Sequence, residues 1–421
     1  MSRRPILQIA LLLAALTPGP SAQTQKRLWV LQPPDKFVEY DIATFAPGQS
    51  LTVPAEVLRN PETLAVNNKG QILFTPRRDE AALDPKPNTT LWFWDGHRGV
   101  LLDRGIVEKA RPAGRSSTVV EAVPQPFLSE DGAHLYWFAN FFTKQKSTEG
   151  LERSVETSFR IWRTDLSGKR AEQIATFSFL PCKCDTGTCE ETCPQGEFWA
   201  PEAGVGDFFL VTHWVPGQLG SEYQSSFLYR KLNGNWPPRK LPHPVSVILD
   251  AASGGATMVE ANPDGACCGR VNEGDDQTLI TRNGRTTMLF DELERYHNPD
   301  YDVSFRTRVA KLAPRLDSVA MEIVSSAEVG GEVRLLSDGT ASAGELAEIK
   351  RAMAQMPVVE VLTLDPSPKR AAMLPHTALV GWLTENEILI VEDQQLVAFN
   401  PLTRSRRKSG IKTAPSRVFL R

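Results

Sequence analysis

The sequence lacks the short motifs that mark several large enzyme classes. Its 421 residues contain no Gly-x-Ser-x-Gly nucleophile elbow, no Gly-rich phosphate-binding loop and no His-Glu-x-x-His zinc motif. These absences argue against a nucleophile-elbow hydrolase, a phosphate-loop nucleotide binder and a zinc peptidase of the His-Glu-x-x-His kind.

The sequence also has no excess of basic residues. It contains 47 lysines and arginines against 50 acidic residues, a formal net charge of −3. Residues 1–22 carry two of the basic residues and no acid, so without them the balance falls from −3 to −5. Nonspecific nucleic-acid binding needs a basic surface. Nucleic acid is therefore not an expected partner.

Long hydrophobic runs are absent except for one at the N-terminus. Residues 6–16 are almost all apolar, but a membrane-spanning helix needs about 20 such residues. The basic pair Arg3 and Arg4 precedes this run, and a Pro-Gly-Pro cluster followed by two small residues ends it. This arrangement predicts a cleaved signal peptide at residues 1–22, a periplasmic or secreted protein, and no membrane span afterwards. The general secretory route and the twin-arginine route both stay open.

Helical patterns are scarce, and the 31 prolines and 29 glycines are spread along the chain. Between them lie short runs of aromatic and β-branched residues, which is typical of many short strands joined by turns. One unit recurs: a short apolar strand that runs into an Asp or Asn turn. Its seven copies occupy residues 37–42, 91–96, 160–166, 227–234, 278–284, 361–366 and 396–401.

Most copies have similar neighbours. Another strand, entered through a polar turn, precedes the copy, and a short strand follows it, which is how a four-stranded propeller blade reads. The six intervals between Asp41 and Asn400 average about 60 residues, whereas a simple blade has ~40–50, so several blades carry insertions.

The largest insertion covers residues 326–357 and contains the one convincing helical pattern. Ser342 and Glu345 have the spacing of a capping box at a helix start. Leu346, Ile349 and Met353 then fall on one helical face. We expect a helix that decorates a blade.

The two ends of the chain complement each other. The first copy has only one strand before it, at residues 27–31, and residues 417–420 form a last strand without a blade. If that strand completes the first blade, the ring closes and no sheet edge stays open. The sequence therefore predicts an all-β fold, a single β-propeller over residues 23–421 with seven four-stranded blades, and a monomer. Six or eight blades, or a pair of β-sandwiches, are the alternatives.

This pattern resembles the TolB-like and WD40-like β-propeller repeats over residues 27–421. In that family the turn before the second strand is typically Ser-Pro-Asp-Gly, and the nearest copy here is Ser129-Glu130-Asp131-Gly132. The other blades depart from it. The resemblance implies a ring with a binding surface at one mouth and transfers no catalytic residue.

Six cysteines occur, none before residue 182. In an exported chain an even number favours disulfides over a metal site, and the spacing lacks Cys-x-x-Cys pairs. Four thiolates around zinc form the alternative, but no metal site is predicted. The disulfide candidates are Cys182, Cys184, Cys189, Cys193, Cys267 and Cys268.

The adjacent pair Cys267 and Cys268 has two interpretations. The two cysteines can bridge each other in a strained ring, which marks a ligand contact or a redox switch. Such a bridge lies beside the cofactor in quinoprotein alcohol dehydrogenases, which are also propellers. Alternatively each cysteine braces neighbouring blades, and this interpretation is favoured.

Asp275 and Asp276 follow shortly after, and carboxylates are ligands that Ca²⁺ prefers. Cys267, Cys268, Asp275 and Asp276 are therefore the candidate binding residues. No cofactor is predicted, and Ca²⁺ is the one candidate ion.

These observations favour a non-enzymatic exported propeller that binds a protein or a cell-envelope component at one mouth. The alternative is an enzyme with its site in the propeller channel, either a quinone- or calcium-dependent oxidoreductase or a hydrolase. Fold alone does not choose between them.

Overall fold

The computed structural model describes nineteen stretches of the chain. They are residues 26–55, 65–67, 70–74, 91–102, 118–122, 127–129, 132–146, 152–166, 171–178, 198–216, 222–232, 235–241, 245–252, 256–261, 277–292, 295, 303, 305–325 and 343–420. In these stretches no helix has the length and apolar character needed to cross a membrane. The expected signal peptide lies outside them and stays a prediction.

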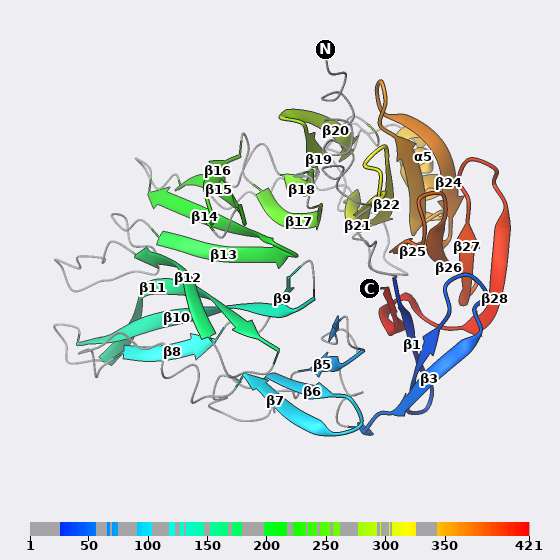
Figure 1. Cartoon of the computed structure of the whole chain (residues 1–421). Helices are drawn as coiled ribbons and strands as arrows, with labels where there is room; N and C mark the ends of the chain where they lie inside the picture. The colour runs from blue at the N-terminus through cyan, green and yellow to red at the C-terminus, as the bar shows by residue number, and fades with distance from the viewer. Residues whose placement is uncertain are drawn as a thin grey trace, which may run out of the picture.

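Seven antiparallel sheets follow one another around a common axis (Figure 1). Six sheets have four strands each, and the third has five because two short strands, β8 and β9, both pair with β10 at its inner edge. The chain is a seven-bladed β-propeller, which confirms the predicted fold class. We number the blades 1 to 7 along the chain.

From the channel outward, each blade has an innermost, a second, a third and an outermost position for its strands. The innermost strands are β29 (Val418–Leu420), β4 (Ala65–Val66), β8 (Thr118–Ala122) with β9 (Phe127–Leu128), β13 (Phe198–Val205), β17 (Val245–Ala251), β21 (Phe305–Leu312) and β25 (Thr377–Trp382). The second strands are β1 (Leu28–Gln32), β5 (Ile72–Phe74), β10 (His134–Lys146), β14 (Phe208–Pro216), β18 (Thr257–Ala261), β22 (Ser318–Ser325) and β26 (Ile388–Glu392).

The third strands are β2 (Lys36–Tyr40), β6 (Leu91–Trp94), β11 (Glu152–Asp165), β15 (Glu222–Arg230), β19 (Gln277–Arg282), β23 (Val358–Thr363) and β27 (Gln395–Phe399). All seven copies of the recurring sequence unit coincide with these third strands. The outermost strands are β3 (Pro47–Thr52), β7 (Arg98–Leu102), β12 (Ala171–Ser178), β16 (Pro238–Lys240), β20 (Arg285–Asp291), β24 (Lys369–Pro375) and β28 (Arg406–Lys412).

The C-terminal strand β29 completes blade 1, as the sequence predicts. It follows a short 3-10 turn, η3 (Pro415–Arg417), and pairs antiparallel with β1, with Val418 opposite Val30 and Leu420 opposite Leu28. In Figure 1 the C-terminus lies near the middle of the ring, beside β1. The ring is therefore closed by segments from the two ends of the chain.

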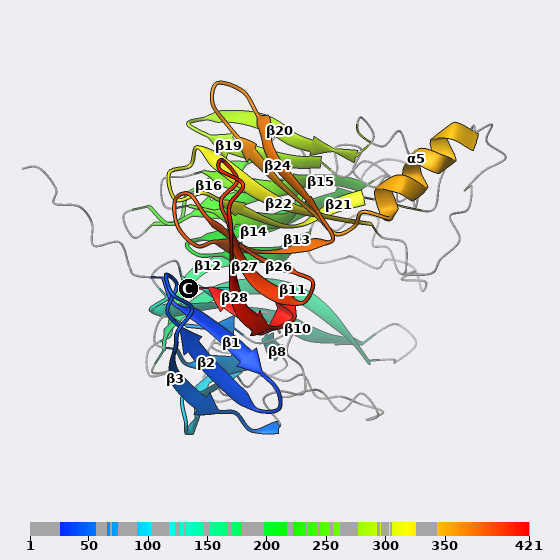
Figure 2. The ribbon, with the colours of Figure 1, turned by 90° about the vertical axis from the view of Figure 1, so that its right-hand side faces the viewer.

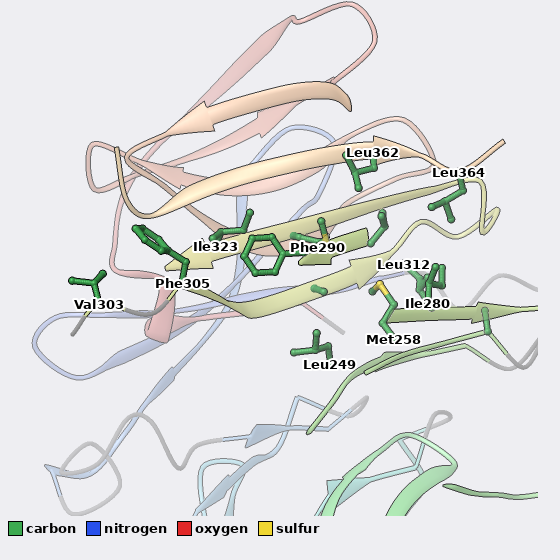
Figure 3. Close-up of a cluster of buried hydrophobic side chains, with 14 of the residues drawn as sticks. Leu249, Met258, Ile280, Phe290, Val303, Phe305, Leu312, Ile323, Leu362 and Leu364 are labelled. Atoms are coloured by element: carbon green, nitrogen blue, oxygen red, sulfur yellow. The ribbon is translucent and has the colours of Figure 1, made fainter. Parts of the chain in front are cut away.

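The hydrophobic core lies between blades. A blade is covered on both faces by its neighbours, so its central strands are buried and mostly apolar, as in residues 319–323 of β22, where Glu322 is the one charged residue. Successive side chains point to opposite faces and enter different clusters. Figure 3 shows the cluster between blades 5 and 6, where Met258 and Ile280 of blade 5 face Leu312 and Leu362 of blade 6.

One helix, α5 (Ala343–Met353), lies between β22 and β23, inside the predicted insertion. Ile349 is buried, and Leu346 and Met353 pack against the cluster between blades 5 and 6. These are the three residues that the sequence places on one helical face. Figure 2 shows α5 extending from the edge of the ring.

Gly70 shows how tightly blades 1 and 2 pack. Its φ is +75°, and a Cβ added there would lie 2.5 Å from Cζ2 of Trp29, whose ring stacks on Phe37 with centroids 4.9 Å apart. Gly70→Ala combines left-handed strain of about 1–2 kcal/mol with overpacking of about 1–3 kcal/mol. We expect the free energy of unfolding in urea to fall by about 3 kcal/mol.

Gly284→Ala is the matched control. Gly284 has the same φ of +75°, and nothing lies within 4 Å of an added Cβ. Its replacement by alanine should lower stability by the strain of about 1–2 kcal/mol alone. Equal losses in the two variants would show that Gly70 does not pack against Trp29.

Candidate functional site

The connections between strands differ in length on the two faces of the ring. Successive strands of a blade run in opposite directions, so connections open alternately on one face and the other. Those from a second to a third strand, or from an outermost strand to the next blade, share one face. All seven connections of more than ten residues belong to this set: residues 53–64, 75–90, 103–117, 179–197, 262–276, 292–304 and 326–357.

We call this the long-connection face and the opposite one the short-turn face. The segments that hold the predicted site residues start and end at the long-connection face. Cys267, Cys268, Asp275 and Asp276 lie between β18 and β19, and the cysteines at 182, 184, 189 and 193 lie between β12 and β13. All eight residues are outside the described part of the chain, so the disulfides and the Ca²⁺ site stay predictions. Within the described part, no three His, Cys, Asp or Glu side chains gather as a metal site.

Two arginines of blade 6 lie beside the central channel. Arg306 and Arg308 are exposed although they lie in β21, the innermost strand of the blade. A bulge between Thr307 and Val309 makes Arg308 an extra residue in the pairing with β22. Because β21 is the innermost strand of blade 6, these exposed side chains lie at the edge of the blade that borders the channel. Both residues lie in the half of β21 that begins at the long-connection face.

Glu322 of β22 connects this channel wall to blade 7. Its side chain is 1% exposed, and its Oε2 accepts a hydrogen bond from the backbone N–H of Leu379 in β25 at 2.9 Å. Its Oε1 is paired with the guanidinium of Arg308. Burial raises the pKa of the Glu322 carboxyl, while the Leu379 N–H and Arg308 act in the opposite direction. The carboxylate thus holds an inner-strand N–H that the blade itself leaves without a partner.

The same arrangement recurs between other blades. The fully buried Glu292 accepts a hydrogen bond from the N–H of Phe305, the first residue of β21. The hydroxyl of Ser226 in blade 4 accepts one from the N–H of Val245 in β17 at 2.8 Å. Side chains of one blade therefore fix the inner strand of the next, which gives the channel a rigid wall.

A polar network lies at the short-turn ends of the inner strands of blades 5, 6 and 7. Asp250 of β17 accepts a hydrogen bond from the N–H of Leu312 at 2.8 Å and lies 3.4 Å from Nζ of Lys311. Trp382 Nε1 donates to the Lys311 carbonyl at 2.8 Å, and Lys26 Nζ donates to the Trp382 carbonyl at 2.6 Å. The network joins the segment before β1 to blades 5, 6 and 7.

The pKa of Lys26 is lowered, mainly by burial and in addition by the charge of Lys311, while Asp250 acts in the opposite direction. Each polar group in this network has a partner within the ring. We therefore assign the network to ring closure and regard the long-connection face as the candidate functional face.

Sequence patterns give little warning of these residues. Inner strands hold Arg306, Lys311 and Asp250. Bulges and charged residues interrupt the apolar runs of these strands, so a search for alternating or continuous apolar patterns does not find them. A signal does exist, because charged residues inside a strand that is otherwise buried are unusual.

Comparisons with known proteins extend only to the fold. No protein-family model and no curated protein matches the sequence. Dipeptidyl peptidase 4 from Porphyromonas gingivalis is 8% identical, with a TM-score of 0.44, over 92% of this chain and 58% of its own. Acylaminoacyl peptidase from Pyrococcus horikoshii is 12% identical, with a TM-score of 0.40, over 90% of this chain and 48% of its own.

A third solved structure is the β-propeller domain of the trilobed protease from Pyrococcus furiosus. It is 12% identical, with a TM-score of 0.41, over 90% of this chain and 88% of its own. This chain thus spans about half the length of the two peptidases and most of the isolated propeller domain. The seven sheets of this chain themselves support the propeller-repeat resemblance predicted from the sequence. These likenesses carry no activity across.

Proposed function

We propose that this chain is an exported β-propeller that acts as a binding scaffold, with a protein or cell-envelope partner bound at the long-connection face. The observation that carries the proposal is that all seven connections of more than ten residues start and end at that face. Loops mounted on a rigid scaffold are where binding residues concentrate. The N-terminal signal pattern supports an extracytoplasmic location.

The positive charge at the channel favours a partner that carries an acidic group at the contact. Arg306 and Arg308 are exposed beside the channel, and Arg308 already pairs with Glu322. Arg306 therefore contributes the guanidinium that an acidic side chain of a partner would meet. Guanidinium groups bind carboxylates and phosphates through two parallel hydrogen bonds.

Site-specific photo-cross-linking tests the proposal. A photoreactive residue replaces Arg306 in the full chain expressed in its own cells, and the cross-linked partner is identified and purified. The partner should then bind the Arg306→Glu variant at least about tenfold more weakly, the loss expected for a charge in contact. Binding is measured by calorimetry with the purified components.

Arg285→Glu provides the control. Arg285 is exposed and begins β20 at the short-turn face, so the same charge reversal there should leave the affinity within about twofold. A partner that responds to Arg285→Glu and not to Arg306→Glu would contradict the assignment of the face. Turnover of sugars, alcohols or lactones by the purified protein would contradict the scaffold function itself.

A further inference from the structure

A groove of about 330 Å³ runs between the outer parts of blades 6 and 7. Its walls come from residues 370–374 of β24, from Phe399 at the end of β27, and from Arg404 and Arg406 around the following turn. The volume is within the ~300–1,000 Å³ range of ligand sites. Phe399, Arg404 and Arg406 lie toward the short-turn face, whereas residues 370–374 follow β24 along the outer side of blade 6. The groove is therefore separate from the channel wall at Arg306.

The lining of the groove carries three arginines and no acidic residue. Arg370 has a carboxylate, Glu360, 3.5 Å away, but Glu360 also binds Arg295 at 2.5 Å. Arg406 lies 3.3 Å from Glu392, and its guanidinium carbon is 5.1 Å from the centroid of the Phe399 ring. Two carboxylates thus face four guanidiniums around the groove, and the excess is positive.

Arg404 supplies the most available of these charges. It is exposed, and its backbone has φ of +59°, a left-handed conformation that costs a residue with a side chain about 1–2 kcal/mol. The turn is held by Asn400, whose Oδ1 accepts hydrogen bonds from the N–H groups of Leu402 and Thr403 at 3.0 Å. The turn therefore fixes the backbone of Arg404 beside the groove, with its side chain exposed.

The groove follows the edge of β24 and not one of its faces. Ala372 and Leu374 belong to the buried cluster between blades 6 and 7, whereas Met373 and Arg370 are exposed. A groove lined by both sets runs along the strand's edge, since neighbouring side chains point to opposite faces. Among the described strands, β24 pairs only with β23, so this edge offers N–H and C=O groups to another strand.

We propose that the groove binds an extended acidic peptide segment of a partner protein. The segment pairs with the free edge of β24, and its alternate carboxylates meet Arg370, Arg404 and Arg406. Edge-strand addition of this kind takes its affinity from main-chain hydrogen bonds and its specificity from side chains at alternate positions. Met373, which is 42% exposed, gives an apolar contact for the stems of those side chains.

A short fluorescent peptide with glutamate at alternate positions and threonine between them tests the proposal on the full chain. We expect saturable binding that weakens as ionic strength rises. Arg404→Glu should reduce the affinity at least about tenfold, because a charge-assisted contact becomes a repulsive one. The same peptide with methylated backbone nitrogens should bind at least about fivefold more weakly.

Four controls distinguish the possible outcomes. Arg306→Glu, in the channel, should bind the peptide like the unaltered protein, so failure here and failure of the proposed function are distinguishable. A glutamine version of the peptide that binds equally well would overturn the role of the arginines. Full affinity of the methylated peptide would overturn edge pairing. If the methylated peptide binds as well as the original and inorganic phosphate displaces both, the groove is a site for a free oxyanion instead.

Discussion

Val418→Asp is expected to lower the free energy of unfolding by about 4 kcal/mol or more. Val418 is buried against Leu28 and Val30 in the cluster shared by blades 1 and 7. The change removes about 1.5–3 kcal/mol of apolar burial and puts a carboxylate without a partner in its place. Because β29 has only three residues, the strand should detach and open the ring. Urea unfolding followed by tryptophan fluorescence measures the loss.

Ser416→Asp introduces the same charge two residues earlier, at an exposed position in η3. It should change the stability by no more than about 0.5 kcal/mol. If both variants unfold like the original protein, the C-terminal strand does not hold the ring together. If both lose several kcal/mol, the effect comes from net charge near the terminus and not from burial.

Glu322→Ala is expected to cost about 3–5 kcal/mol. The substitution leaves the N–H of Leu379 and the guanidinium of Arg308 without their acceptor between two packed blades. Glu322→Gln keeps an oxygen for Leu379 and leaves Arg308 half exposed beside the channel, so its cost should stay within about 1 kcal/mol. Glu348→Ala, at an exposed position in α5, is the control. Similar losses for the alanine and glutamine variants would contradict this account.

The pH dependence follows from the direction of the Glu322 pKa. Burial raises the pKa in the folded state above its ordinary value of 4.5, so the folded protein holds the proton more tightly than the unfolded chain. The contribution of Glu322 to stability is therefore most favourable below about pH 4.5 and falls as pH rises through the raised value. Glu322→Gln should remove this component from the pH profile of stability.

The blade repeat could be predicted from the sequence because one strand in each blade is regular. The third strand is apolar and ends in an Asp or Asn turn, as at Asp95 after β6, whose side chain accepts a hydrogen bond from the N–H of His97. Closure could also be predicted, since β1, the strand of Trp29, has a partner only on its outer edge and the strand of Phe419 has none until the two ends meet. Both signals are local in sequence.

The inner strands could not be predicted in the same way. β4 and β9 have two residues each, and β17 and β21 contain bulges that break the alternation of side chains. The polar groups that fix them, such as Asp250 and Glu322, act across blades on backbone atoms that no sequence spacing reveals. The groove at Arg404 could not be predicted either, because its arginines come from two blades that are distant in sequence.

Closure of the ring by β29 has a consequence for biosynthesis. Residues 418–420 are synthesised long after β1, so the inner edge of β1 has no partner while the other six blades emerge from the ribosome. The contact that completes the ring joins positions separated by almost the whole chain, and contacts of this kind form late and slowly. A nascent chain interrupted anywhere before Val418 therefore lacks the closing strand, which leaves an exposed edge that chaperones and proteases can recognise.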